Sequence, residues 1–584
     1  MISPCFIASL AISLVPVSAM AASRVTPIEY RVEIVAPADL ASLLEKHLEL
    51  VKWRGDYRLT VEQLDRLIET TPEQAAGLLA TEGYFSPTIS VQQDEQQLPR
   101  QIRVVVTPGN PVLIRSVDLR LEGPIADDAN RNDELAERID AQWELPTGTV
   151  FRQSSWERSK SMALERLSSR DYPTARIISS EARIDPQTES ADLVLHIDSG
   201  PAYVYGPVQI EGLRRYPEKL VTNMIRIEPG QPYRRRQLLT LQSDIQNLPQ
   251  FSAVVVEAEY PDVPPYIAPV HVRVDEAPLH RVGVGLGYTT NTGFRTTLDY
   301  RYLNLFGQGL AFTSKLNLEQ KEQGLDLGVA FPRTEAGYDF TAYLNGKTSS
   351  IEGLDTTAYT LGLSRVRQEF RLERSMILEY QTEERSAGGL SDKPTALTFN
   401  YVLKHRELDN IRDPRQGHLA QFEIGGGSEQ LLSDASFLRL YGKALQYQRL
   451  PFDGLLQARI ELGQTFSGQT GGIPSDWLFR AGGSNSVRGY DYESLGIYRD
   501  GTVYPGKVIG TASLEYQHPV LKDWRAALFA DYGGAAASWG ELDPVLGLGL
   551  GARWVSPVGT LGADLAYGLD REQWRFSLAL GLAL

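Results

Sequence analysis

The residues of this 584-residue chain best suited to do chemistry lie in and just after a long segment rich in Gly and Ser, 467–506. This segment contains Val487-Arg488-Gly489-Tyr490, and the acidic residues Glu515 and Asp531 follow on two predicted strands. Period-2 alternation places Glu515 and the spaced motif Phe529-x-Asp531-x-Gly533 on the same face. A guanidinium that meets carboxylates away from water forms strong, bidentate ion pairs. The pattern predicts an internal ion-pair site around Arg488, the alternative being that Arg488 is a solvated loop charge.

Other patterns that often mark catalytic or cofactor sites carry little weight. Gly547-x-Gly549-x-Gly551 resembles a nucleotide-binding loop only superficially, because no predicted helix follows it, and we interpret it as a row of inward-facing glycines. The seven His show no spacing typical of metal ligands, and no Ser/His/Asp signature is visible. The single cysteine, Cys5, lies in a predicted signal peptide, so the mature chain has no thiol. We expect no enzymatic activity, no cofactor and no metal.

The N-terminal segment, 1–22, predicts export. It has no charged side chain, an apolar run from Phe6 to Val17 and the small-residue ending Ala19-Met20-Ala21, which is typical of a cleaved signal peptide. An N-terminal anchor helix is the alternative, although the apolar run is short for crossing a bilayer. The formal charge of -15 disfavours nucleic acid as the main partner, since phosphate binding needs an excess of Lys and Arg.

Short β-branched runs then alternate with amphipathic helical stretches in an order that recurs three times. This repetition predicts three α+β modules of the pattern β-α-α-β-β, the alternative being three unrelated α+β domains. In the first module a helix is expected over 72–82, and in the second a helix over 156–169. The predicted modules cover 27–107, 111–199 and 203–277.

Helical periodicity disappears after the third module, and period-2 alternation continues to the C-terminus. Near the end, Trp574, Phe576 and Leu578 alternate with Gln573 and Arg575. Strands of about ten residues with an apolar, aromatic-rich face are typical of a transmembrane β-barrel in an exported chain. We predict an antiparallel barrel of sixteen strands over 281–584. The predicted strands begin near residues 281, 294, 310, 323, 337, 356, 371, 394, 418, 435, 454, 507, 524, 545, 558 and 573.

A barrel of this size has a lumen wider than its own side chains can fill, and the segment 467–506 is therefore the predicted plug loop. We predict that the weakest closure lies between the first strand, Arg281 to Thr290, and the last, Gln573 to Ala583. Glycines give little side-chain packing there and favour kinking. We call this closure the lateral seam, and its predicted glycines are Gly283, Gly285, Gly287 and Gly581.

With these residues the chain resembles the Omp85 superfamily, in which periplasmic POTRA modules precede a 16-stranded barrel. Val487-Arg488-Gly489-Tyr490 is similar to the family's (V/I)RG(F/Y) motif in the sixth extracellular loop. Phe529-x-Asp531-x-Gly533 is similar to the inward-facing partner motif on the thirteenth strand, and Glu515 to an acidic position on the twelfth. Asp413-Pro414-Arg415-x-Gly417 is similar to a turn common in the family.

The resemblance implies an outer-membrane protein with periplasmic POTRA modules that assembles and inserts other β-barrel proteins, including autotransporters. Three modules and this length are most similar to the TamA type, the outer-membrane subunit of the translocation and assembly module. That type implies a TamB-like partner anchored in the inner membrane, with unfolded outer-membrane protein or autotransporter clients and outer-membrane lipid as further contacts. Two alternatives are open, a two-partner secretion transporter with a dedicated substrate and a passive channel.

Overall fold

The computed structural model describes residues 28–94, 99–469, 471–557 and 559–581. The predicted signal peptide at 1–22, with Cys5, and the last three residues lie outside this described part. The chain divides into two compact units: one holds the first two modules, and the other holds most of the third module and the whole C-terminal domain. Among the helices of the described residues, none is both long enough and apolar enough to cross a membrane.

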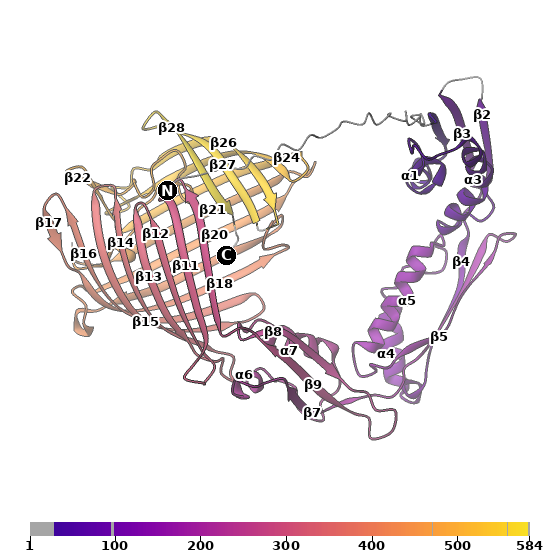
Figure 1. Ribbon diagram of the computed structural model, residues 1–584, viewed down its shortest axis with the longest axis horizontal. Coiled ribbons are helices and arrows are strands. Elements are labelled where there is room, and N and C mark those ends of the chain that lie inside the picture. The colour runs from indigo at the N-terminus through magenta and orange to yellow at the C-terminus, as the bar shows by residue number, and fades with distance from the viewer. Residues whose placement is uncertain (1–27, 95–98, 470, 558, 582–584) are drawn as a thin grey trace, which may run out of the picture. The chain divides into compact units, whose positions relative to one another are not determined.

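Each module contains a three-stranded sheet (Figure 1), with strand orders β1-β3-β2, β4-β6-β5 and β7-β9-β8. In the first two modules the first strand pairs in parallel with the last, and the second strand forms an antiparallel hairpin with the last. The strands are β1 (Tyr30–Val35), β2 (Thr88–Asp94), β3 (Arg100–Thr107), β4 (Leu113–Glu122), β5 (Arg176–Asp185), β6 (Ser190–Asp198), β7 (Val204–Glu211), β8 (Phe251–Ala258) and β9 (Ile267–Glu276).

Helices supply the other half of each module core. In the first module Leu44, Leu64 and Leu79 are fully buried in one cluster with Ile102 and Val104 of the central strand, so the apolar faces of helix and sheet cover each other. The helices are α1 (Ala38–His47), α2 (Glu49–Lys52), α3 (Val61–Thr81), α4 (Ala129–Asp140), α5 (Gln153–Ser168), α6 (Lys219–Thr222) and α7 (Arg235–Gln246).

The structure corrects the helix expected over 72–82, because α3 begins at Val61 and passes through Pro72. A capping box fixes its start: the Thr60 hydroxyl accepts from the backbone N–H of Gln63, and the Gln63 side chain accepts from the backbone N–H of Thr60. Proline is common at a helix start, which made Pro72 resemble one. The cap at Thr60, twelve residues upstream, is the stronger signal.

The second module has the two helices of the predicted pattern, although the sequence had located only the one over 156–169. The additional helix, α4, is mostly polar, and Ile139 is its buried residue. Asp128 caps its N-terminus by accepting a hydrogen bond from the backbone N–H of Arg131. A helix with so narrow an apolar stripe gives little hydrophobic periodicity to detect.

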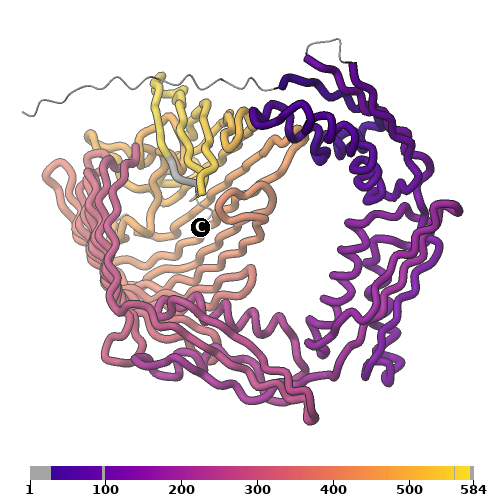
Figure 2. The backbone as a smooth tube through the Cα atoms, turned by 45° about the vertical axis from the view of Figure 1, so that its right-hand side comes forward, coloured from indigo at the N-terminus to yellow at the C-terminus, as the bar shows by residue number. Residues whose placement is uncertain are grey.

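The C-terminal domain is a near-closed barrel of sixteen antiparallel strands, which confirms the predicted fold class (Figures 1 and 2), and the three-residue β17 (Leu390–Asp392) only extends the hairpin at the end of β16. Every strand begins within two residues of its predicted start. The strands are β10 (His280–Thr289), β11 (Gly293–Leu305), β12 (Leu310–Glu319), β13 (Glu322–Ala330), β14 (Asp339–Ile351), β15 (Leu354–Gln368), β16 (Leu372–Ala387), β18 (Thr395–Leu408), β19 (Gly417–Gly427), β20 (Phe437–Arg449), β21 (Leu455–Phe466), β24 (Val508–Leu521), β25 (Trp524–Ala536), β26 (Val545–Ser556), β27 (Gly559–Gly568) and β28 (Gln573–Gly581).

Alternation along these strands separates an apolar outer face from a polar lumen. On β15, Tyr359, Leu361 and Leu363 are each more than half exposed on the outside. On β25, Leu528 and Tyr532 point outward, whereas Asp531 between them is fully buried. An exposed apolar band around a sheet with internal polar groups is the surface that a lipid bilayer accommodates.

The sheet has two ends, β10 and β28. Consecutive barrel strands are joined by continuous registers, such as β10 with β11 and β27 with β28. Within the described residues no such ladder joins β10 to β28. Thr290, the residue directly after β10, accepts a hydrogen bond at Oγ1 from the backbone N–H of Leu578 in β28, at 3.3 Å.

Candidate functional site

The long loop between β21 and β24 folds into the barrel lumen. Its side chains Trp477, Phe479, Ala481 and Val487 are all buried. The backbone of Phe479 exchanges two hydrogen bonds with Gly506 at the loop's other end. The loop therefore carries a small apolar core into a polar lumen, which holds it as a compact unit rather than a loose connection.

Arg488 of this loop meets Asp531 of β25 through three hydrogen bonds. Nε and Nη2 of the guanidinium donate to the two carboxylate oxygens at 2.7 and 2.9 Å, and the backbone N–H of Arg488 donates to Oδ2 at 3.0 Å. Asp531 also accepts from the Ser513 hydroxyl at 2.6 Å. The bidentate geometry uses the planar guanidinium, which an ammonium group cannot reproduce.

Two further carboxylates complete the site. Arg488 Nη1 lies 2.7 Å from Glu515 Oε2 and 3.3 Å from Asp564 Oδ2. Arg553 of β26 bridges the same two acids, since its Nε and Nη2 donate to Glu515 and its Nη1 to Asp564 at 2.6 Å. The result is a continuous network of two guanidinium groups and three carboxylates, which we call the lumen ion cluster.

The lumen ion cluster is almost completely shielded from water. The exposed fractions of its side chains run from 0% for Asp531 to 8% for Arg553. A cavity of about 150 Å³ adjoins the lumen ion cluster, and Arg459 of β21 lines it. Arg459 donates to the backbone carbonyl of Ser486. Together with the cluster it makes three guanidinium groups beside three carboxylates. Buried charges are tolerated when paired, and removing one partner typically costs about 3–5 kcal/mol.

Glycines leave room for the loop to approach the wall. A side chain at Gly547 would meet the backbone carbonyl of Arg488 at 2.0 Å, and one at Gly549 would meet the Phe529 ring at 2.3 Å. Phe529 in turn lies under Arg488, whose Cζ is 3.3 Å from the ring centroid, so the cation rests on the aromatic face. Gly489 has φ +95°, a backbone conformation that residues with a side chain rarely adopt.

The rest of the loop motif is anchored nearby. Val487 is fully buried, and the Tyr490 hydroxyl donates to Asp570 Oδ2 at 2.7 Å and lies 3.1 Å from the Leu546 carbonyl oxygen. Gly533, with φ +145°, pairs with Thr511 of β24. The structure thus brings Val487, Arg488, Gly489, Tyr490, Glu515, Phe529, Asp531 and Gly533 to one region of the lumen.

The turn motif between β18 and β19 connects to the same network from the opposite end of the barrel. Asp413 accepts from Arg525 Nη2 at 2.6 Å, Arg525 Nη1 contacts Gln517, and Gln517 donates to Glu515. Pro414 lines the same cavity, and Arg415 lies 3.5 Å from Asp413. Gly417, with φ +117°, closes the turn where a side chain would clash with the Glu407 carbonyl.

The seam glycines lie apart from the lumen ion cluster. Gly283, Gly285 and Gly287 alternate along β10 and pair with Asp299, Thr297 and Arg295 of β11. Gly581 ends β28 opposite Thr560. Their outward neighbours Val282, Val284 and Leu286 are 67–83% exposed.

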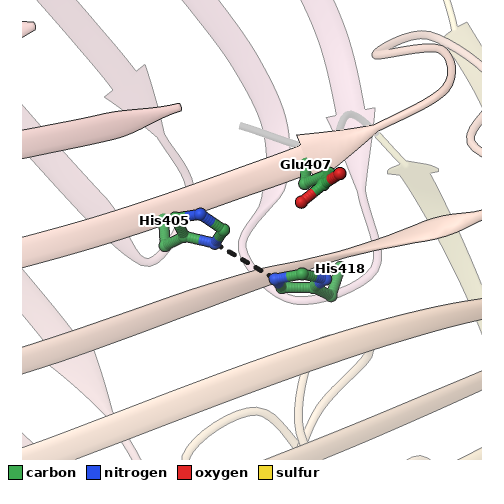
Figure 3. A group of neighbouring side chains, drawn as sticks. All are labelled: His405, Glu407 and His418. Carbon is green, nitrogen blue, oxygen red and sulfur yellow. Dashed lines mark hydrogen bonds between the residues drawn. The ribbon is translucent and has the colours of Figure 1, made fainter. Parts of the chain in front are cut away.

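One group of described side chains offers three potential metal ligands: His405 and Glu407 of β18 and His418 of β19 (Figure 3). They lie on the outer face, and His405 Nδ1 is 3.1 Å from His418 Nε2. Glu407 pairs with Arg371 at 2.8 Å. Each of the three side chains is thus engaged within the protein, although the spacing of the His in the sequence gave no sign that two would meet.

Sequence reasoning missed Arg553, Asp564 and Arg459. The sequence did contain an indication that Arg553 points into the lumen, because the inward-facing glycines at 547, 549 and 551 continue in period 2 to Arg553. No comparable signal marks Asp564, whose place opposite Gly551 depends on the register of β26 with β27.

Comparisons with known proteins agree with this architecture. A family model for the Omp85 superfamily domain matches residues 280–583, and a POTRA model, described as surface antigen variable number repeat, matches 203–277. The outer membrane protein assembly factor BamA of Neisseria meningitidis serogroup B is 22% identical over 587 residues, covering 87% of this chain and 72% of that protein. BamA of Neorickettsia risticii is 25% identical over 414 residues, covering 65% of this chain and 54% of that protein.

The fold has a solved counterpart. The crystal structure of BamA from Haemophilus ducreyi lacking POTRA domains 1-3 superposes with a TM-score of 0.62 at 14% identity, over 79% of this chain and 98% of that one. The matched barrel domain makes up more than half of the residues, and the chain therefore belongs to the Omp85 superfamily.

Proposed function

We propose that this outer-membrane protein, whose POTRA modules lie in the periplasm, assembles and inserts other β-barrel proteins by opening its lateral seam. The observation that supports the proposal is the missing ladder between β10 and β28 in the described residues. Each unpaired backbone group in lipid costs several kcal/mol. A barrel with one unladdered junction therefore holds two strand edges ready to pair with an incoming strand.

The composition of β10 favours opening at this place. Gly283, Gly285 and Gly287 leave the middle of its inner face without side chains, so few lumen contacts hold this part of the strand in position. A client strand that adds to the edge of β10 would satisfy the exposed backbone groups and release the folding free energy of the client. The reaction needs no nucleotide, because pairing and burial of the client supply the driving force.

We propose further that the protein is of the TamA type and couples to a TamB-like partner anchored in the inner membrane. The support is the count of three modules and the sheet edges that they offer. The edge strands β2 and β5 carry mostly exposed or half-buried residues and can accept a partner strand by β-augmentation. Autotransporters and other unfolded outer-membrane proteins are the proposed clients.

The test is a disulfide across the lateral seam. Thr290→Cys with Leu578→Cys joins the two residues that already contact each other, and the predicted mature chain has no other cysteine. We expect oxidation to abolish insertion of a client barrel into membranes containing the purified protein, and reduction to restore it. The measurement is the fraction of client that becomes resistant to SDS unfolding on a gel.

A matched control places the same pair of substitutions in a junction that is already laddered. Thr296 and Leu318 are opposite each other on β11 and β12. A disulfide between Thr296→Cys and Leu318→Cys therefore joins two strands that remain paired during the proposed insertion. Oxidised control protein should insert clients as well as wild type. Full activity of the oxidised seam variant would rule out insertion through the seam and favour a transporter or channel that works through the lumen.

A further inference from the structure

An apolar groove runs along the outer face of the barrel over β14, β15, β16 and β18, next to the turn between β13 and β14. Its volume is about 580 Å³, and its walls are almost entirely hydrocarbon. The groove lies on the exposed side of the sheet, where Phe331, Phe340 and Phe399 are 39–50% exposed. The other apolar walls are Leu363, Met376 and Leu378.

The groove opens at the end of the barrel that faces the third module. Phe331 and Pro332 belong to the turn between β13 and β14, and the Arg333 carbonyl in that turn accepts a hydrogen bond from Asn223 Nδ2 at 2.8 Å. Asn223 follows α6 of the third module. The mouth of the groove therefore lies at the periplasmic boundary of the membrane.

Guanidinium groups gather at this mouth. Arg365 lies over the Tyr338 ring, with Cζ 4.2 Å from the centroid, and Arg367 approaches the same ring at 5.4 Å. Arg367 is directly opposite Arg374 in the ladder between β15 and β16, where like charges repel. Arg371 lies in the turn between these strands.

Only part of this charge is compensated. Glu369 lies between Arg367 and Arg374, at 3.3 and 3.7 Å, and Glu407 pairs with Arg371 at 2.8 Å. Arg365 forms no ion pair with any residue that the structure describes. Four guanidinium groups thus face two carboxylates, and the excess positive charge sits at the edge of an apolar groove.

We propose that this surface binds an anionic phospholipid of the periplasmic leaflet. Its phosphate would lie among Arg365, Arg367 and Arg374, and an acyl chain would occupy the groove below. Guanidinium groups match phosphate oxygens in a bidentate manner, and basic clusters beside membrane spans recruit anionic head groups. A water-soluble phosphate compound would use the arginines but leave the groove empty, and a neutral lipid would do the reverse.

The experiment is native mass spectrometry of the full chain in detergent, titrated with phosphatidylglycerol or with phosphatidylcholine of the same acyl chains. We expect wild type to retain phosphatidylglycerol preferentially, and inorganic phosphate not to displace it. The variant Arg365→Gln/Arg367→Gln/Arg374→Gln should lose about tenfold in phosphatidylglycerol affinity, with phosphatidylcholine binding unchanged.

A charge-matched control removes three arginines that are 63–65% exposed in the first two modules, Arg58, Arg120 and Arg183, and should bind like wild type. If the triple variant does not fold, Arg374→Gln alone should lose about threefold, because the contacts of Tyr338 remain intact. Equal retention of the two lipids by wild type, or an undiminished preference in a folded variant, would overturn the proposal. Displacement by inorganic phosphate would overturn it in favour of a soluble ligand.

Discussion

Arg488 shows why a guanidinium is needed at this position of the plug loop. It donates from its backbone and from three side-chain nitrogens to Asp531, Glu515 and Asp564, while its flat face rests on Phe529. The loop therefore attaches to three separate strands through a single side chain. Its removal leaves three buried carboxylates that face fewer cations.

We expect Arg488→Met to release the loop from the wall. The loss of one partner from a buried ionic network costs about 3–5 kcal/mol, more than a loop held by a small apolar core can offset. The measurement is proteinase K cleavage between residues 474 and 505 in purified protein, and the variant should be cut at least tenfold faster than wild type. The control is Arg499→Met, an exposed arginine in the same loop. A cleavage rate equal to that of wild type would show that the apolar core alone holds the loop.

At the scale of the element, β9 ends in a carboxylate that organises the junction before the barrel. Glu276 Oε1 accepts from the backbone N–H groups of Arg214 and Arg215 at 2.8 Å, and Oε2 accepts from Arg215 Nε at 2.6 Å. Burial of this carboxyl tends to raise its pKa, but these hydrogen bonds outweigh the effect and hold the pKa below its usual value.

This shift predicts a pH-dependent junction. Because the pKa of Glu276 is lower in the folded state, its carboxylate stabilises the fold at pH above the unfolded pKa, near 4.5. The stabilisation is lost as the pH falls from there through the folded pKa. The protection factors for hydrogen exchange of the Arg214 and Arg215 backbone amides, which compare each rate with the intrinsic rate at the same pH, should fall over that range in wild type, and Glu276→Gln should abolish this dependence. Glu211→Gln, an exposed acid on β7, should behave like wild type; a profile for Glu276→Gln that still follows pH would exclude Glu276 as the cause.

Side-chain amides join the third module to the barrel turns. Gln250 donates to the Gly309 carbonyl at 3.0 Å, Asn304 to the Arg215 carbonyl at 2.9 Å, and Asn223 to the Arg333 carbonyl. All three bonds connect an amide donor to a backbone acceptor, so they are insensitive to pH. Most of the third module belongs to the same compact unit as the barrel.

At the scale of the whole molecule, the proposed insertion factor differs from a channel in what fills its lumen. A sixteen-stranded barrel is too wide for its own side chains to close, and the loop between β21 and β24 lies inside. We expect replacement of residues 474–505 by a short Gly-Ser linker to give a large, steady conductance in planar bilayers, whereas wild type gives a small one.

The control for this deletion removes Gly388 to Leu390, at an exposed hairpin tip on the same end of the barrel, and should conduct like wild type. A large, steady conductance of the wild-type protein would contradict the plugged barrel. It would support the passive channel, the alternative that the sequence had left open.

Local patterns in the sequence determined most of the fold. Alternation of apolar and polar residues has the period of the strand itself, so all sixteen barrel strands could be located from their own residues. The inward orientation of Glu515 and Asp531 followed from the same alternation. The helix α4 escaped because one buried residue, Ile139, gives no period to detect, and α3 was shortened because Pro72 imitates a helix start.

Only the tertiary structure decided which inward residues meet. Asp564 reaches Arg488 because β25, β26 and β27 pair in registers that set Asp531 opposite Gly547 and Gly551 opposite Asp564. Asp413 reaches Arg525 across 112 residues of chain. Among the described residues, the absence of a ladder between β10 and β28 likewise depends on the stagger accumulated around the whole sheet. Such registers are sums over many strand pairs, and no single stretch of sequence contains them.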